Sequence, residues 1–203
     1  LAPLRKLYLA GNHLVGNIPS CLGNLTTLSD LSLAGNELSG PIPESFGGLT
    51  QLRYLSLRDN KLTGPIPSSL GNLANLEELW LNANEIQGEI PAALGNMTKV
   101  RKVFLNNNLI EGQLPGTLGN LSSLVILSLR YNRLRGTVPA TLGRLGNLKT
   151  LYMDKNELEG SIPDTLANLS SLEELNLLGN KFEGKAATRN LLIGCMPNCV
   201  VYI

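Results

Sequence analysis

The chain has 203 residues, a formal net charge of +1 and 16% charged residues. This balance predicts no strong electrostatic field, so it argues against recognition of nucleic acid or of an anionic membrane surface. No apolar run reaches about 18 residues, so no direct membrane insertion is expected from this chain. No signal peptide is visible, and a start at Leu1 without Met indicates an excerpt of a larger protein or a processed product.

A 24-residue repeat organises residues 1–184 without an insertion. The unit reads L-x-x-L-x-x-L-x-L-x-x-N-x-L-x-G-x-I-P-x-x-L-G-N. One unit cannot bury its own apolar face, but stacked units can, so the period predicts a solenoid of eight repeats. Residues 185–203 lose the pattern and are interpreted as a divergent C-terminal capping segment. The repeats start at residues 1, 25, 49, 73, 97, 121, 145 and 169.

Each part of the unit predicts one local structure. The x-L-x-L-x stretch alternates with period two, which indicates a short strand with one buried face. The glycine permits a left-handed backbone, and the apolar-Pro pair predicts an extended segment on the opposite side. The asparagine amide can both donate and accept, so stacked copies predict a ladder that satisfies buried peptide groups. The ladder residues are Asn12, Asn36, Asn60, Asn84, Asn108, Asn132, Asn156 and Asn180.

The asparagine followed by L-x-G-x-I-P resembles the plant-type leucine-rich repeat, and the likeness covers residues 1–184. This resemblance implies an α/β solenoid, a right-handed superhelix with a parallel sheet on its concave face and 3₁₀ turns and short strands on its convex face. It also implies a binding role, because the family includes receptor-like kinase and receptor-like protein ectodomains and polygalacturonase-inhibiting proteins. Such a role favours an extracellular or cell-surface location, with an intracellular assembly as the alternative.

The outward positions of the predicted strands carry six of the nine aromatic residues. In the stretch LEELWLNANEIQGEIP, the alternation turns Leu79 and Leu81 inward, so Trp80 points outward. Aromatic residues suit strands in any case, but this many on one face favour a recognition surface with Trp80 and Phe104 at its centre. The predicted ligand-binding residues are Tyr8, Tyr54, Trp80, Asn82, Phe104, Asn106, Arg130, Tyr131 and Tyr152.

Charged residues in neighbouring repeats predict lateral ion pairs across the sheet. The group formed by Arg130, Arg133 and Arg135 is outside this pattern, and it is interpreted as a contact for an acidic partner or as a solvated edge. The predicted pairs are Lys6 with Asp30, Glu77 with Arg53 and Arg101 on its two sides, Glu78 with Lys102, and Lys149 with Glu173.

Two further features bear on the compartment. Cys195 and Cys199 stand close together in GCMPNC, which predicts either a short-loop disulfide or two free thiols. Asn-x-Ser/Thr sequons are N-glycosylation candidates only if the chain is secreted, and the repeat consensus GNLSSL creates such sequons by itself. All of them fall on one repeat position, so glycans there would leave the inner sheet face open. The sequons begin at Asn24, Asn96, Asn120 and Asn168.

No sequence pattern indicates catalysis, a metal or a cofactor. His13 is the only histidine, so a four-ligand zinc set is missing. The stretch GNKFEGKA resembles a phosphate-binding loop, but Ala186 stands where Ser or Thr is required, and the repeat itself explains the match. We therefore expect neither an enzyme nor a cofactor.

Three functions are compatible with these observations. The first is a non-catalytic module that binds a protein or peptide on the concave sheet face. The second is a structural scaffolding subunit of a larger assembly, and the third is an inhibitor of a secreted cell-wall-degrading glycosidase. Ice binding fits less well, because it would require a flat, regular array of Thr or Asn and the outward columns are irregular.

Overall fold

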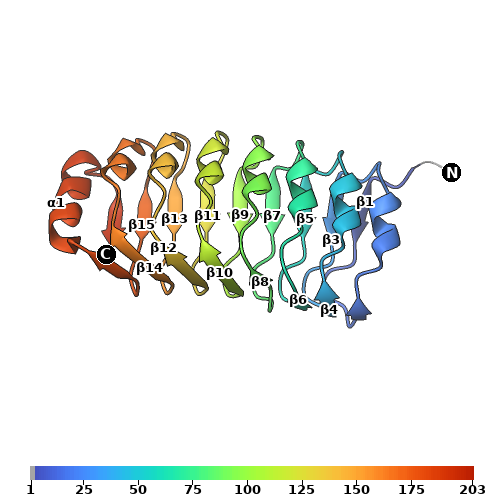
Figure 1. The fold of residues 1–203 in the computed structure, drawn as a ribbon. Coiled ribbons are helices and arrows are strands. Elements are labelled where there is room, and N and C mark those ends of the chain that lie inside the picture. The colour runs from blue at the N-terminus through green and yellow to red at the C-terminus, as the bar shows by residue number, and fades with distance from the viewer. Residues whose placement is uncertain (1–2) are drawn as a thin grey trace.

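The computed structural model describes residues 3–203 as an elongated array of stacked repeats, with the two chain ends at opposite ends (Figure 1). A nine-stranded, fully parallel sheet runs along the array, and its strands follow chain order. The strands are β1 (Lys6–Tyr8), β3 (Asp30–Ser32), β5 (Tyr54–Ser56), β7 (Glu78–Trp80), β9 (Lys102–Phe104), β11 (Ile126–Ser128), β13 (Thr150–Tyr152), β15 (Glu174–Asn176) and β17 (Val200–Tyr202). From β1 to β15, each strand pairs with residues 24 positions further on, as Lys6 does with Asp30, whereas β15 pairs with β17 at a spacing of 26 positions.

A stack of short 3₁₀ helices forms a second side of the array (Figure 1). Each helix begins directly after a proline in extended conformation, as Pro91 shows with φ −62° and ψ 133°. The apolar-Pro pair therefore ends the extended segment and starts the turn back to the sheet. The helices are η1 (Ser20–Asn24), η2 (Glu44–Gly48), η3 (Ser68–Asn72), η4 (Ala92–Asn96), η5 (Gly116–Asn120), η6 (Ala140–Arg144) and η7 (Asp164–Asn168).

Two smaller parallel sheets form the third side, one with three strands and one with five. Their register joins residues 22 positions apart, as for Val15 and Glu37. With the main sheet and the 3₁₀ helices, they confirm the predicted α/β solenoid. Their strands are β2 (Val15–Asn17), β4 (Glu37–Pro41), β6 (Lys61–Thr63), β8 (Gln87–Gly88), β10 (Leu109–Gln113), β12 (Arg133–Gly136), β14 (Glu157–Ser161) and β16 (Lys181–Glu183).

The repeat leucines fill one continuous core between these sides. Leu79 and Leu81 have no exposed surface, and Phe46 and Phe182 also lie in the core. The 3₁₀ helices stack so closely that a Cβ on Gly71 would lie 2.4 Å from the backbone oxygen of Ala93 in the next repeat. Glycine at this position is therefore a requirement of stacking.

The ladder asparagines join neighbouring repeats through their side-chain amides. Asn108 shows the arrangement: its Nδ2 donates to the carbonyls of Leu81 (3.0 Å), Leu105 (3.0 Å) and Asn106 (3.3 Å). Its Oδ1 accepts from the backbone N–H of Ile86 at 3.0 Å. The acceptor bond and the donor bond to the preceding repeat recur at every ladder residue from Asn36 to Asn180.

Residues 185–203 form α1 (Lys185–Cys195) and β17 at the C-terminal end of the array. The helix packs against η7, and β17 extends the main sheet beside β15 (Figure 1). The segment thus stands where a cap would cover the last repeat. Within residues 3–203, no helix combines the length and apolar character needed to cross a membrane.

The disulfide considered for Cys195 and Cys199 is absent, because both thiols are free. Cys195 is exposed at the end of α1, whereas Cys199 is buried in the core just before β17. The two side chains therefore lie in different environments. Burial raises the pKa of the Cys199 thiol, with a smaller contribution from the Glu174 carboxylate.

Candidate binding face

The outward-facing side chains of the nine-stranded sheet form one continuous surface, called the sheet face below. Strand register aligns one residue from each strand into a central column across this face. Tyr202, which belongs to the predicted capping segment, pairs in register with Asn176 and extends the column. The column reads Tyr8, Ser32, Ser56, Trp80, Phe104, Ser128, Tyr152, Asn176 and Tyr202.

Trp80 and Phe104 form a stacked pair at the middle of the sheet face. Their ring centroids are 4.0 Å apart, and the ring planes differ by 21°. The Trp80 indole Nε1 donates to Glu78 at 2.9 Å, and the Arg58 guanidinium lies 5.5 Å from the ring centroid. Both rings are half-buried, so these neighbours hold them in place while leaving part of each ring exposed. Neither Glu78 nor Arg58 was among the predicted site residues.

A second cluster surrounds Arg130, two strands further along the sheet. The Arg130 guanidinium lies 5.2 Å from the ring centroid of Tyr131 and 5.5 Å from that of Tyr152. One of its nitrogens, Nη2, also pairs with the Asp154 carboxylate at 3.1 Å. The Tyr152 hydroxyl donates to Glu174 at 2.6 Å, and this hydrogen bond, together with partial burial, raises the pKa of Tyr152 to about 12.

Tyr131 adopts a backbone conformation that large side chains rarely take. Its φ is 53°, and about half of its side-chain surface is exposed. The fold imposes this left-handed conformation at the same position of every repeat, where glycine or a short side chain fits with less strain. A tyrosine here carries a conformational cost, which favours a functional role. The eight residues with positive φ at this position are Gly11, Gly35, Asp59, Ala83, Asn107, Tyr131, Lys155 and Gly179.

Buried polar atoms without a hydrogen-bond partner concentrate on the sheet face. In residues 3–203, the buried side-chain atoms of this kind are Ser56 Oγ, Asn82 Oδ1, Arg130 Nε and Asp154 Oδ1. Ser56 pairs in register with Trp80, and Asn82 follows Trp80 two residues later, whereas Arg130 and Asp154 belong to the second cluster. Such atoms cost stability, and they are found at both aromatic centres.

The remaining predicted site residues flank these centres. Tyr8 is exposed, and its hydroxyl donates to Asp30 at 3.1 Å, near the N-terminal end of the sheet. Tyr54 is half-buried and pairs in register with both Asp30 and Glu78. Asn106 is half-buried on the strand end next to Asn82. The predicted residues therefore share one face but divide into an N-terminal group, the Trp80 centre and the Arg130 cluster.

Lateral ion pairs cross the sheet at four of the predicted places, whereas Arg101, expected beside Glu77, forms no ion pair within residues 3–203. Their nitrogen–oxygen distances are 3.6 Å for Lys6–Asp30, 2.6 Å for Arg53–Glu77, 3.0 Å for Lys102–Glu78 and 2.6 Å for Lys149–Glu173.

The basic group around Tyr131 differs from its prediction, because two of its members are paired. Arg130 reaches Asp154, and Arg135 lies 3.6 Å from Glu157 in the neighbouring repeat. Both acids lie in the following repeat, Asp154 just after β13 and Glu157 at the start of β14. The group is therefore largely neutralised by the chain itself.

The four sequon asparagines are all exposed at the last residue of a 3₁₀ helix, in η1, η4, η5 and η7. They lie away from the aromatic centres, on the connection that leads into the next strand. Among residues 3–203, no three His, Cys, Asp or Glu side chains are grouped to hold a metal ion. The sheet face offers aromatic contact, hydrogen bonding and charge pairing.

Family models and solved structures both match the chain. The family model described as "Leucine-rich repeat region" matches residues 1–110, and "Leucine rich repeat" matches residues 122–182. No curated protein sequence matches the chain.

Two of the similar structures are receptor ectodomains from Arabidopsis. The ectodomain of the membrane receptor kinase GASSHO1/SCHENGEN3 from Arabidopsis thaliana, in complex with CASPARIAN STRIP INTEGRITY FACTOR 2, is 38% identical with a TM-score of 0.79. That match covers 88% of this chain and 24% of the receptor chain. The Arabidopsis receptor kinase HAESA, in complex with the peptide hormone IDA and the co-receptor SERK1, is 35% identical with a TM-score of 0.81, and the match covers 87% and 30% of the two chains.

A plant ice-binding protein is also similar, at 31% identity and a TM-score of 0.73, with 89% of this chain and 66% of that chain covered. This chain therefore spans only about a quarter to a third of the receptor ectodomain chains and about two thirds of the ice-binding protein. The repeat unit, the stacked architecture and the matched family models agree over most of the chain. The protein belongs to the leucine-rich repeat family, in its plant-type form with receptor-kinase ectodomains among its structural relatives.

Proposed function

We propose that the chain is a non-catalytic module that binds a protein or peptide on its sheet face, with Trp80 and Phe104 at the centre of the site. The observation that carries this proposal is the stacked, half-buried ring pair. Arg58 and Glu78 hold the indole in place, so little side-chain entropy is lost when a partner covers the rings. Large, preorganised aromatic side chains near the middle of a surface are typical binding hot spots.

The relatives support this class of ligand. The GASSHO1/SCHENGEN3 ectodomain is in complex with CASPARIAN STRIP INTEGRITY FACTOR 2, and HAESA is in complex with the peptide hormone IDA. Peptide binding is therefore a role that the same architecture performs at about this level of sequence identity. The activities of the full receptors are not carried over, because the chain spans only 24% and 30% of those two ectodomain chains.

An extracellular or cell-surface location agrees with this function. The matched ectodomains belong to plant membrane receptors, and all four sequon asparagines are exposed. Glycans at these positions would stand on the connections after the 3₁₀ helices and would leave the Trp80 centre accessible. Similarity to the ice-binding protein does not change the proposal, because the central column mixes bulky aromatic rings with serines and lacks a flat repetitive array.

Selection from a displayed random-peptide library, followed by titration of the chosen peptides, tests the proposal. We expect Trp80→Ala combined with Phe104→Ala to weaken the binding of these peptides by about 30-fold. This loss is the equivalent of about 2 kcal/mol for a hot-spot pair. The matched control is Gln113→Ala, an exposed change in the small sheet on another side of the solenoid. Circular dichroism should show the same melting behaviour for wild type and control.

Unchanged peptide affinity in the Trp80/Phe104 double variant would show that the binding site lies elsewhere. A library that yields no binder at all would contradict peptide recognition itself.

A further inference from the structure

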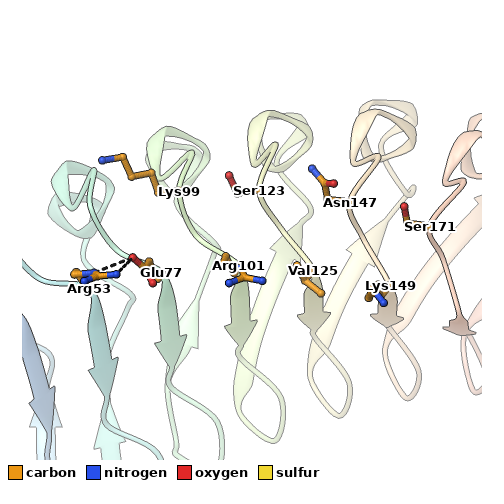
Figure 2. A pocket seen from close by; sticks show the side chains of 9 residues that line it. All are labelled: Arg53, Glu77, Lys99, Arg101, Ser123, Val125, Asn147, Lys149 and Ser171. Carbon is orange, nitrogen blue, oxygen red and sulfur yellow. Dashed lines mark hydrogen bonds and ion pairs between the residues drawn. The ribbon is translucent and has the colours of Figure 1, made fainter.

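A shallow groove runs beside the aromatic column, along the segments that lead into the strands. Figure 2 shows a row of side chains that crosses five neighbouring repeats at the strand entrances: Arg53, Glu77, Arg101, Val125 and Lys149. The groove has a volume of about 740 Å³ and is open to solvent along its length. It lies outside the Trp80 centre, because none of its lining residues belongs to the central column.

The row is basic, and the acid in it, Glu77, already pairs with Arg53. Both Nε and Nη2 of Arg53 donate to Oε1 of Glu77, at 2.8 and 2.6 Å. Glu77 therefore points toward Arg53 and away from Arg101, as the dashed lines in Figure 2 show. The residue on the other side of Arg101 in the row is Val125, which cannot pair with a cation. Arg101 thus lies between Glu77, which is paired with Arg53, and the apolar side chain of Val125.

A second cation comes from the same repeat. Lys99 lies two residues before Arg101 and donates to Asn75 Oδ1 at 2.8 Å, a neutral acceptor that leaves its charge uncompensated. Lys149, by contrast, pairs with Glu173 at 2.6 Å. Among the ion pairs within residues 3–203, neither Lys99 nor Arg101 takes part. The groove therefore holds two exposed cations from one repeat that form no ion pair among the described residues.

We propose that this groove binds an acidic peptide segment, with carboxylates on Arg101 and Lys99. A guanidinium matches a carboxylate with two parallel hydrogen bonds, and a lysine ammonium supplies a point charge for a second carboxylate. Ser123, Asn147 and Ser171 line the same groove and offer polar groups to a peptide backbone (Figure 2). The site is separate from the proposed Trp80 centre and does not depend on it.

The charge pattern favours a peptide over a uniformly charged polymer. Glu77 and Val125 interrupt the row on both sides of Arg101, and the whole chain has a formal net charge of only +1. A sulfated polysaccharide or nucleic acid gains affinity from many consecutive cations, which this groove does not provide. A segment with one or two carboxylates among neutral residues fits two cations flanked by serine, asparagine and valine.

Fluorescence anisotropy with a labelled peptide of alternating Glu and Ser residues tests this site, at low ionic strength. We expect Lys99→Gln combined with Arg101→Gln to weaken the binding of this peptide at least tenfold. The matched control is Arg144→Gln with Lys155→Gln, because these two exposed cations also form no ion pair among the described residues and lie outside the groove. The control should change affinity by less than twofold, although it removes the same charge.

Two further measurements separate the possible sources of binding. Trp80→Ala with Phe104→Ala should leave the acidic peptide bound, so a failure of the peptide-binding face would not be mistaken for a failure of the groove. An equal loss in both charge variants, no measurable binding of the peptide, or tighter binding of heparin that the groove variant does not weaken would each overturn the proposal.

Discussion

The interior of the solenoid and its sheet face use the same 24-residue frame in opposite ways. In the interior, each ladder asparagine from Asn36 to Asn180 makes the same bonds to the preceding repeat, and the inward leucines of the x-L-x-L-x stretches from Leu31 to Leu177 are buried. On the sheet face, the central column changes its side chain at nearly every strand, and only Ser32 and Ser56 repeat in succession. The inward side chains are thus nearly the same in every repeat, whereas the outward side chains differ from strand to strand.

The two regions also differ in how well their polar groups are satisfied. The interior amides find donors and acceptors inside the array, whereas the unpartnered buried side-chain atoms of residues 3–203 lie on the sheet face. A repeat array can carry such local costs because its stability is summed over many similar interfaces. The interior therefore supplies stability, whereas the unpartnered polar side chains of the sheet face lower it.

Removing one ladder amide should give the largest effect on stability. Asn108→Ala would leave buried backbone groups of Ile86 and Leu81 without their partners, so we expect the free energy of unfolding to fall by about 3 kcal/mol. The matched control is Asn12→Ala, since the exposed Asn12 donates only to nearby carbonyls of its own repeat, at 3.0 and 3.3 Å. Urea unfolding of both variants provides the measurement, and a loss of the same size in the control would contradict the ladder's inter-repeat role.

Relieving the strained tyrosine should change stability in the opposite direction. Tyr131→Gly removes a bulky side chain from a left-handed position, and we expect a gain of about 0.5 kcal/mol after the loss of the contact with Arg130. Ala83→Gly makes the same backbone change without an aromatic contact and should gain about 1 kcal/mol. Thermal unfolding of the two variants compares them directly. A destabilised Tyr131→Gly variant would show that the ring contacts outweigh the backbone strain.

Much of the interior and part of the sheet face could be predicted from the sequence because the period is strict. Alternation alone placed Leu79 and Leu81 inside and Trp80 outside, and the structure confirms all three positions. The same frame brings Trp80 beside Phe104, which are 24 residues apart. It also aligns Arg130 with Asp154, which are 24 residues apart as well. The repeat spacing could therefore have predicted this ion pair, although we did not predict it.

Other contacts follow spacings that the main repeat does not contain. Arg135 reaches Glu157, 22 positions away, because the small sheets pair with a register two residues shorter than that of the main sheet. Tyr202 follows its neighbour Asn176 by 26 positions, because α1 replaces the usual turn between their strands. Ring stacking angles and the choice of Glu77 between two arginines depend on side-chain geometry, which periodicity does not specify.

The smallest expected effect concerns the acid–base behaviour of Asp30 on the sheet face. Partial burial alone would raise the pKa of Asp30, but hydrogen bonds from Ser29 and Tyr8 and the nearby Lys6 ammonium together hold it below its ordinary value. A depressed pKa stabilises the folded state above the ordinary aspartate pKa, and this contribution is lost as the pH falls through the lower folded value.

We therefore expect wild type to lose about 0.5 kcal/mol more than Asp30→Asn between neutral and strongly acidic pH, a size typical of an exposed ion pair. The measurement is urea unfolding of both proteins at a series of pH values, where acids shared by the two cancel in the difference. Addition of salt should shrink that difference, since the Lys6 ammonium is largely exposed. Parallel curves at all pH values would show that these contacts on the sheet face add nothing to the stability supplied by the interior.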